Sequence, residues 1–323
     1  MIRVHKCREQ DRKRRVSPVK IISFLGAVIV SGCVLYGMPT ADRSANAQTA
    51  TSTPAGAPSA PTALPRGRVY LFRGALGLIF SRGMDKLAKR LEEAGVPVEV
   101  NEFTVCPFIA ERAIREYRQD PAPITLVGHS MGGRCALEFA EKLQTENIPV
   151  SLVVTIDPAH LMPKVPNNVE RYMNIFLAGD VLGGGDVTPE KDYPGHFASF
   201  DLSKLRKVVH INIDKMDIIH TQLLTKILQI PETPAKLEGE SVPIRYVVPP
   251  DAAVELWDSG MPAFVRAGDT LETIAANYRV PLWSLTQINQ IPEGAALVAN
   301  QRVIVPRNLI PLVAVTGQSP SKR

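Results

Sequence analysis

Apolar segments alternate with amphipathic segments between residues 68 and 229. Short runs rich in Val, Ile and Leu, bounded by Gly, Pro or polar residues, predict strands. Segments with apolar residues three and four positions apart predict helices. The predicted strands cover 68–72, 96–103, 123–129, 150–157, 171–179 and 207–214, and the predicted helices cover 83–95, 108–119, 131–144 and 217–229.

The alternation of strands and helices predicts an α/β fold with a doubly wound, mostly parallel sheet over residues 66–230. The strands are almost continuously apolar, as expected when helices cover both faces of a sheet. Residues 231–262 leave this rhythm and are predicted to be a linker, although "IRYVV" could be a strand of either neighbour. A second compact pattern at 263–307 predicts a small domain, and the polar residues 308–323 a flexible tail.

The N-terminal segment has the pattern of an export signal. Residues 1–47 begin with a basic region and continue into the apolar stretch "IISFLGAVIVSGCVLYGM". Cleavage after Ala47 is the favoured outcome, but acylation of Cys33 in "VSGC" and retention as a membrane anchor remain open. Residues 48–65 carry no charge and four prolines, which predicts an extended, disordered tether. The chain is therefore expected in the periplasm or cell envelope, with membrane contact possible through this segment.

Charge and cysteine content exclude some functions. The 323 residues carry a net charge of +5, but nine basic and three acidic residues fall within 1–47. The remainder has 28 basic and 29 acidic residues, so no basic face is left for a nucleic acid. Cys106 and Cys135 follow the leader and could form a disulfide in an oxidising compartment, which their spacing alone does not decide. Their spacing does not suit a metal site.

A serine stands at a sharp turn in "ITLVGHSMGGRCALEF". Ser130 comes directly after a predicted strand and before a predicted helix, with Gly128 and Gly132 at two residues on either side. Such a turn lifts the hydroxyl beyond the carboxyl edge of the sheet, where α/β proteins bind ligands. It also brings the amide of Met131 to a helix N-terminus, where unpaired N–H groups favour negative charge. An exposed oxygen beside such a donor is what a nucleophile requires.

This stretch resembles the nucleophile elbow, Gly-x-Ser-x-Gly, of the α/β-hydrolase family, and the resemblance covers residues 66–230. It implies that a histidine base follows the last strand and that an acid orients it. His220 in "DIIHTQLL" fits this order, with His196 in "YPGHFAS" as its competitor. For the acid, Asp157 in "TIDPAH" matches the position used by pancreatic-type lipases and is favoured, with Asp180 as the alternative.

The resemblance further implies a second oxyanion donor in the loop after the first strand. This loop reads "LFRGALG", so the amide of Gly74 or Ala75 would join that of Met131. Arg73 stands where the family often has histidine, and either a structural role or contact with an anionic substrate would explain it. The reaction implied needs no metal or organic cofactor.

Residues 263–307 resemble a LysM module, with a short strand, two helices and a closing strand in order. Asp269 or Thr270 would cap the first helix, and Leu271, Ile274, Ala275 and Tyr278 would form its buried stripe. Such modules bind N-acetylglucosamine glycans of peptidoglycan or chitin. The resemblance assigns glycan contacts to Gly268, Asp269, Thr270, Asn289 and Ile291, although Asn289 could instead cap the second helix.

Together these features predict an envelope serine hydrolase, of esterase or lipase type, tethered to peptidoglycan and acting on a small ester or lipid. Its triad would be Ser130, His220 and Asp157. A glycan-binding envelope protein that uses the hydrolase fold only as a scaffold is the alternative, and acyl transfer to an alcohol or amine would use the same residues.

Overall fold

The computed structural model describes residues 67–75, 77–232, 235 and 240–309. The predicted leader, the tether and all but the first two residues of the predicted tail lie outside these ranges. Within them, no helix combines the length and the apolar composition needed to cross a membrane.

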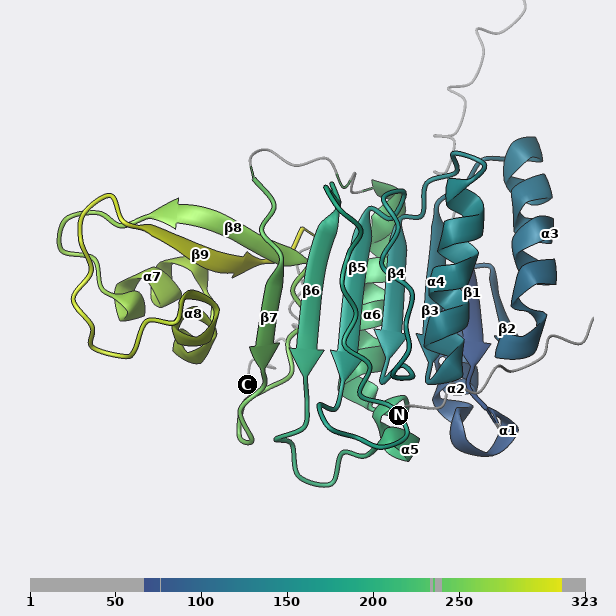
Figure 1. Ribbon diagram of the computed structural model, residues 1–323, viewed down its shortest axis with the longest axis horizontal. Coiled ribbons are helices and arrows are strands. Elements are labelled where there is room, and N and C mark those ends of the chain that lie inside the picture. The colour runs from purple at the N-terminus through teal and green to yellow at the C-terminus, as the bar shows by residue number, and fades with distance from the viewer. Residues whose placement is uncertain (1–66, 76, 233–234, 236–239, 310–323) are drawn as a thin grey trace, which may run out of the picture. The chain divides into compact units, whose positions relative to one another are not determined.

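Seven parallel strands form one sheet in the order β2-β1-β3-β4-β5-β6-β7 (Figure 1). The order reverses between β1 and β3, and open α/β sheets bind their ligands beyond the carboxyl ends of the strands at such a point. The predicted α/β class with a doubly wound parallel sheet is confirmed. The strands are β1 (Arg68–Arg73), β2 (Val98–Glu102), β3 (Ile124–His129), β4 (Leu152–Ile156), β5 (Arg171–Phe176), β6 (His196–Asp201) and β7 (Ile244–Val247).

Helices cover both faces of the sheet (Figure 1). Helices α3 and α4 pack together on one face, and α2 and α6 on the other. The connections from β4 to β5 and from β5 to β6 contain no helix. The helical elements here are α1 (Gly77–Phe80), α2 (Arg82–Glu93), η1 (Phe103–Val105), α3 (Cys106–Gln119), α4 (Met131–Gln144), α5 (His210–Ile213), α6 (Asp217–Gln229) and η2 (Ile230–Glu232).

An apolar core lies on each side of the sheet. On one side, buried Leu87 and Leu91 of α2 join a cluster that contains Leu223 of α6. On the other side, Phe139 of α4 lies against Tyr70 and Phe72 of β1, with ring centroids 5.3 and 5.7 Å apart. Burial of the strands on both faces explains why their sequences lack the alternation of a half-exposed strand.

The sixth strand differs from its prediction. Residues 207–214, predicted as a strand, form a turn and the short helix α5, whereas β6 lies earlier, at His196–Asp201. The side chain of Asn212 causes this turn, because it accepts the amide of Val209 and donates to the carbonyl of Lys207. Lys207 itself has a φ of 68°, which no strand allows.

The seventh strand lies within the segment predicted as a linker. β7 pairs with β6, so "IRYVV" belongs to the large sheet. Trp257, also in that segment, is buried in the core on the α6 side of the sheet. The boundary of the large domain therefore lies beyond residue 230.

The C-terminal part is a small βααβ unit, as predicted. Its elements are β8 (Ser259–Phe264), α7 (Leu271–Tyr278), α8 (Leu282–Asn289) and β9 (Arg302–Arg307), with β8 and β9 antiparallel. Thr270 caps α7 by accepting the amide of Thr273. Leu271, Ile274 and Ala275 are buried, but Tyr278 is 42% exposed and does not belong to the buried stripe.

The small unit packs against the large one through α8. The Gln287 side chain both accepts from and donates to the backbone of Val247 in β7. The Trp283 ring lies beside Tyr246 and Trp257. The two units therefore share apolar contacts as well as hydrogen bonds.

Candidate active site

Ser130 occupies the strained turn between β3 and α4. Its φ of 55° and ψ of −124° are unfavourable for a residue with a side chain. The turn is possible because its flanks approach other backbone closely. A Cβ on Gly128 would lie 2.0 Å from the carbonyl oxygen of Gly132, and a Cβ on Gly132 would lie 2.2 Å from that of Phe72. The sequence therefore forces Ser130 to the carboxyl edge of the sheet.

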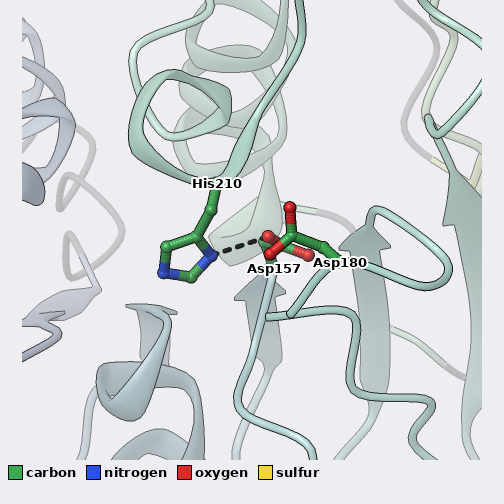
Figure 2. Close-up of side chains that lie close together, drawn as sticks. All are labelled: Asp157, Asp180 and His210. Atoms are coloured by element: carbon green, nitrogen blue, oxygen red, sulfur yellow. Dashed lines mark hydrogen bonds and ion pairs between the residues drawn. The ribbon is translucent and has the colours of Figure 1, made fainter. Parts of the chain in front are cut away.

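Two further polar side chains, those of Asp157 and His210, meet at the same edge of the sheet. Asp157 follows β4, the neighbour of β3, and its Oδ2 lies 2.7 Å from Nδ1 of His210 at the start of α5 (Figure 2). Asp157 Oδ1 accepts the amides of Leu177 and Gly184 at 3.0 and 2.8 Å. The carboxylate is buried and held by three donors, so it fixes the direction of the His210 ring.

Ser130 and His210 leave their reactive atoms unpaired. Among the described residues, neither Ser130 Oγ nor Nε2 of His210 makes a hydrogen bond. The amide of Ser130 donates to the carbonyl of Ile156 at 3.0 Å, which joins the serine turn to the residue before Asp157. The elements thus bring a free hydroxyl and an aspartate-held imidazole to one edge of the sheet, in the chain order Ser130, Asp157, His210.

The predicted contact between His220 and Asp157 is wrong. His220 is fully buried in α6, and its Nε2 lies 2.7 Å from the carbonyl oxygen of Asp214. Burial lowers the pKa of this histidine. The sequence pattern missed His210 because "KVVHINID" has the β-branched composition of a strand, which would have placed His210 inside the sheet. The asparagine at position 212 is the sequence signal that could have indicated a turn here, because its side chain accepts the amide of Val209.

The structure also places His196, the alternative base, and Asp180, the alternative acid. His196 is buried at the first residue of β6, where its Nδ1 lies 2.8 Å from Ser259 Oγ and its Nε2 3.0 Å from the carbonyl of Ala235. It is therefore at the opposite edge of the sheet from Ser130. Asp180 lies beside Asp157 and His210, but its Oδ1 accepts the amides of Leu182 and Gly183 (Figure 2).

The carboxylates of Asp157 and Asp180 and the His210 imidazole offer ligand atoms within 4.8 Å of one another. Such a group can bind a metal ion. Here, however, the Asp157 oxygens accept three N–H groups, and Nδ1 of His210 is one of these donors. A cation at this position would have to displace the aspartate–imidazole hydrogen bond, so the donors present suit an acid that orients a base.

His129, the residue before Ser130, connects three loops through a chain of hydrogen bonds. Its Nε2 donates to the carbonyl of His210 at 3.0 Å, which leaves Nδ1 to accept the Ser81 hydroxyl at 2.8 Å. Ser81 Oγ in turn accepts the amide of Gly74 at 3.0 Å. Burial and the neighbouring His210 lower the pKa of His129 to about 3, so this ring is neutral. It ties the loop after β1 and the loop of His210 to the serine turn.

The Gly74 amide is therefore not a free oxyanion donor, contrary to the first of the two predictions for this loop. Its proton is used by Ser81, while its α-carbon faces the serine. A Cβ at this position would lie 2.7 Å from the Ser130 Cβ and 3.2 Å from its Oγ. Ala75, the second candidate, makes no backbone hydrogen bond among the described residues. Met131 begins α4, as predicted, with its amide in the first turn of the helix.

Arg73 has a structural role. Its guanidinium forms ion pairs with Asp85 and Glu102 and is mostly buried. These carboxylates join α2 and β2 to the end of β1 and leave little of the arginine for an anionic substrate.

Cys106 and Cys135 form a disulfide bond. It joins the first residue of α3 to the second turn of α4, the helix that begins at the serine turn. The open question from the sequence is thus resolved in favour of the bridge.

In the small domain, the predicted glycan residues separate into two groups. Gly268, Asp269 and Thr270 lie in the loop before α7, where Asp269 Oδ2 accepts the amide of Arg266. Asn289 is structural, because its amide group donates to the carbonyls of Leu285 and Ile304 and accepts the amide of Ile304. Ile291 packs against the core of this domain.

A groove of about 690 Å³ lies at the same domain. Of the predicted set it includes Asp269, whereas Gly268, Thr270, Asn289 and Ile291 do not line it. The side chains that give it a polar and aromatic character are Phe264, Arg266, Asp269, Asn277, Tyr278 and Asn300.

Comparisons with known proteins match two parts of the chain. The family model described as a thioesterase domain matches residues 109–173, which contain the serine turn and Asp157. The LysM domain model matches residues 265–306. A solved structure from Xanthomonas campestris pv. campestris, assigned to the alpha/beta hydrolase superfamily, is 19% identical over 39% of this chain and 78% of that chain, with a TM-score of 0.27. No curated protein sequence matches.

The seven-stranded parallel sheet with its strand–turn–helix at Ser130 is an α/β-hydrolase fold. The C-terminal βααβ unit is a LysM domain. The chain thus combines a domain of the α/β-hydrolase fold with a LysM domain.

Proposed function

We propose that this protein is a serine hydrolase that cleaves acyl esters or thioesters through Ser130, His210 and Asp157. The observation that carries the proposal is the hydrogen bond from His210 to the buried carboxylate of Asp157, which also accepts two backbone amides. This pair lies at the edge of the sheet where the turn presents the Ser130 hydroxyl. A hydroxyl becomes a useful nucleophile only beside a base that a third group orients.

In the proposed reaction, His210 Nε2 removes the proton of Ser130 Oγ while this oxygen attacks the acyl carbonyl. Asp157 keeps Nδ1 protonated and stabilises the imidazolium that forms. The amides of Met131 and Ala75 would donate to the oxyanion. The imidazolium then gives its proton to the leaving alcohol or thiol. Water, deprotonated by His210, releases the acid from the acyl-serine and restores the hydroxyl.

Short p-nitrophenyl esters and acyl thioesters test this proposal. Ser130→Ala should lower kcat by about 1,000-fold or more with the circular dichroism spectrum unchanged, because the nucleophile is removed without filling space. Ser203→Ala, which changes an exposed serine just after β6 that contacts none of the three proposed catalytic side chains, should keep the wild-type rate and serves as the matched control. Equal turnover by Ser130→Ala and Ser203→Ala would refute the assignment.

We propose further that the LysM domain holds the enzyme on N-acetylglucosamine glycans of peptidoglycan in the cell envelope. The match to the LysM model, the polar groove beside Asp269 and the predicted export signal support this location. In a pull-down with insoluble peptidoglycan, Tyr278→Ala should reduce the bound fraction, because an aromatic face that packs on a sugar ring is lost. Phe108→Ala, an exposed aromatic of the hydrolase domain, should bind as the wild type does; equal loss in both variants would contradict the proposed groove.

A further inference from the structure

Large apolar side chains are exposed in the connections that leave the carboxyl edge of the sheet, where the candidate active site lies. They follow β1, β2, β4, β5 and β6, so all stand at the carboxyl edge of the sheet, the lower edge in Figure 1. Several are almost fully exposed: Val181 at 87%, Leu161 at 80% and Phe108 at 72%. We call six of them the apolar rim: Ile79, Phe108, Leu161, Val181, Leu182 and Ile211.

The apolar rim is adjacent to the reacting groups. Ile211 follows His210 in the chain, and Leu182 belongs to the loop whose Gly184 amide holds Asp157. Ile79 lies in α1, directly after the loop of Gly74 and Ala75. Exposed apolar residues scattered singly need no explanation, but a ring of them around one site indicates contact with another apolar surface.

A basic segment leads up to His210 and to Ile211 of the apolar rim. Lys204, Arg206 and Lys207 are exposed in the loop between β6 and α5, and none forms an ion pair with any described residue. Val209 and Ile211, in the same segment, are 45% and 44% exposed. The loop that ends in His210 therefore presents unpaired positive charge and apolar side chains together.

We propose that the apolar rim and this basic loop dock on an anionic lipid bilayer, so that the hydrolase acts on acyl lipids taken from that surface. This inference rests on the proposed function and adds its substrate class. Partial insertion of apolar side chains, with basic groups at the anionic headgroups, is how peripheral proteins bind such membranes. A second copy of this chain fits less well, because rim-to-rim contact would bring two unpaired basic loops together.

The width of the apolar rim also favours a bilayer over a single bound acyl chain. A pocket for one chain encloses its apolar lining, whereas these side chains are exposed on five separate connections between strands and the following elements. A planar apolar phase can contact all of them at once. An acidic protein partner would satisfy the basic loop but would leave most of the distant rim residues exposed.

A tryptophan reporter in the full-length chain tests the docking. Leu161→Trp places an indole on the rim, and Val298→Trp places one at an equally exposed position, 71%, in the LysM domain. Both variants share the background of Trp257 and Trp283. With vesicles of brominated phosphatidylglycerol, the Leu161→Trp fluorescence should fall by at least a further third relative to Val298→Trp. A leader that attaches the chain to the vesicle would affect both reporters equally.

A further variant tests whether docking depends on the positive charges of the basic loop. Lys204→Gln, Arg206→Gln and Lys207→Asn, combined with Leu161→Trp, should raise the lipid concentration for half-maximal quenching on the order of 100-fold. Brominated phosphatidylcholine alone should quench the rim reporter only weakly. Equal quenching of the two reporters, or none, would overturn the docking. A dimer in sedimentation that Leu161→Trp disrupts, without quenching, would overturn it in favour of a second copy.

Hydrolysis of a soluble short ester, measured on the same samples, separates the two proposals. Turnover without quenching removes the membrane docking and the lipid substrate inferred from it, and leaves the proposed hydrolase standing. Quenching without turnover supports the docking surface but removes the proposed hydrolase and, with it, the acyl-lipid substrate.

Discussion

At the residue scale, the base of the candidate site is His210, and the spacing of histidines in the sequence did not find it. His220 has the expected chain order, but it lies within α6 and its Nε2 is bonded to the carbonyl of Asp214, which precedes that helix. Only the structure shows that residues 207–213 turn back toward Asp157. Ser130 and Asp157 could be placed from sequence because each directly follows a strongly apolar strand.

Replacing each of these histidines separates their roles. His210→Gln should lower kcat for a soluble ester by at least 100-fold, because no group remains to accept the Ser130 proton. His220→Gln should change kcat less than 10-fold and act mainly on stability, since its partner is a structural carbonyl. The assignment of His210 would be contradicted if His220→Gln proved the more damaging change in kcat.

His129 should make the protein sensitive to acid. Its pKa is lowered from 6.5 to about 3 in the folded state, so between these values the unfolded chain binds a proton that the native state does not. Falling pH through this window therefore reduces the free energy of unfolding by up to about 1.4 kcal/mol per pH unit. Asp214 acts in the opposite sense, because its pKa is raised to about 6 by burial.

The comparison with His129→Gln isolates the histidine contribution. This variant should be less stable at pH 8, where it loses the bonds to Ser81 and His210, but its urea midpoint should fall less steeply between pH 6 and 4. Parallel slopes for the variant and the wild type would show that His129 is not buried in its neutral form. If the kcat of His129→Gln falls at low pH over the same range as that of the wild type but reaches a lower maximum, His129 is a positioning residue.

At the scale of elements, most helices and strands follow from apolar periodicity, because burial on both faces gives the strands a clear composition. α6 begins and ends at the predicted residues. The exceptions have local causes. β6 reads "HFASFD" and lacks the β-branched residues that predict a strand, while β7 is short and follows a proline-rich segment.

The disulfide between α3 and α4 should stabilise the element that carries the serine turn. It closes a loop with a sequence separation of 29, which in the chain-entropy account contributes about 3 to 4 kcal/mol. Cys106→Ala combined with Cys135→Ala should lower the free energy of unfolding by that amount, measured by urea denaturation. Dithiothreitol should destabilise the wild type similarly and leave the variant unchanged; identical wild-type midpoints with and without reductant would contradict the bridge.

At the scale of the whole molecule, the described parts of the hydrolase and LysM domains belong to one compact unit. Besides the α8 contacts, a buried ion pair joins Lys226 of α6 to Asp258, the residue before β8, at 3.2 Å. Asp258 also accepts the amide of Leu309. The sequence indicated two domains but not this connection, because such a pair is made by residues far apart in the chain.

Removing one partner of this buried pair should destabilise both domains. Lys226→Met leaves the Asp258 carboxylate buried without this ion-pair partner, at a cost of about 3 to 5 kcal/mol. Lys86→Met, which breaks the exposed pair with Asp217, should cost less than about 1 kcal/mol. Calorimetry should show a single transition shifted to lower temperature by Lys226→Met; two separate transitions in the wild type would contradict a shared packed unit.

The most direct test of the central claim is the site of reaction with a fluorophosphonate, which traps an activated serine covalently. Mass spectrometry of the labelled protein should find the adduct on Ser130, with labelling strongly slowed by His210→Gln and little affected by His220→Gln. An unmodified Ser130, or labelling that survives His210→Gln and is lost in His220→Gln, would contradict the triad of Ser130, His210 and Asp157.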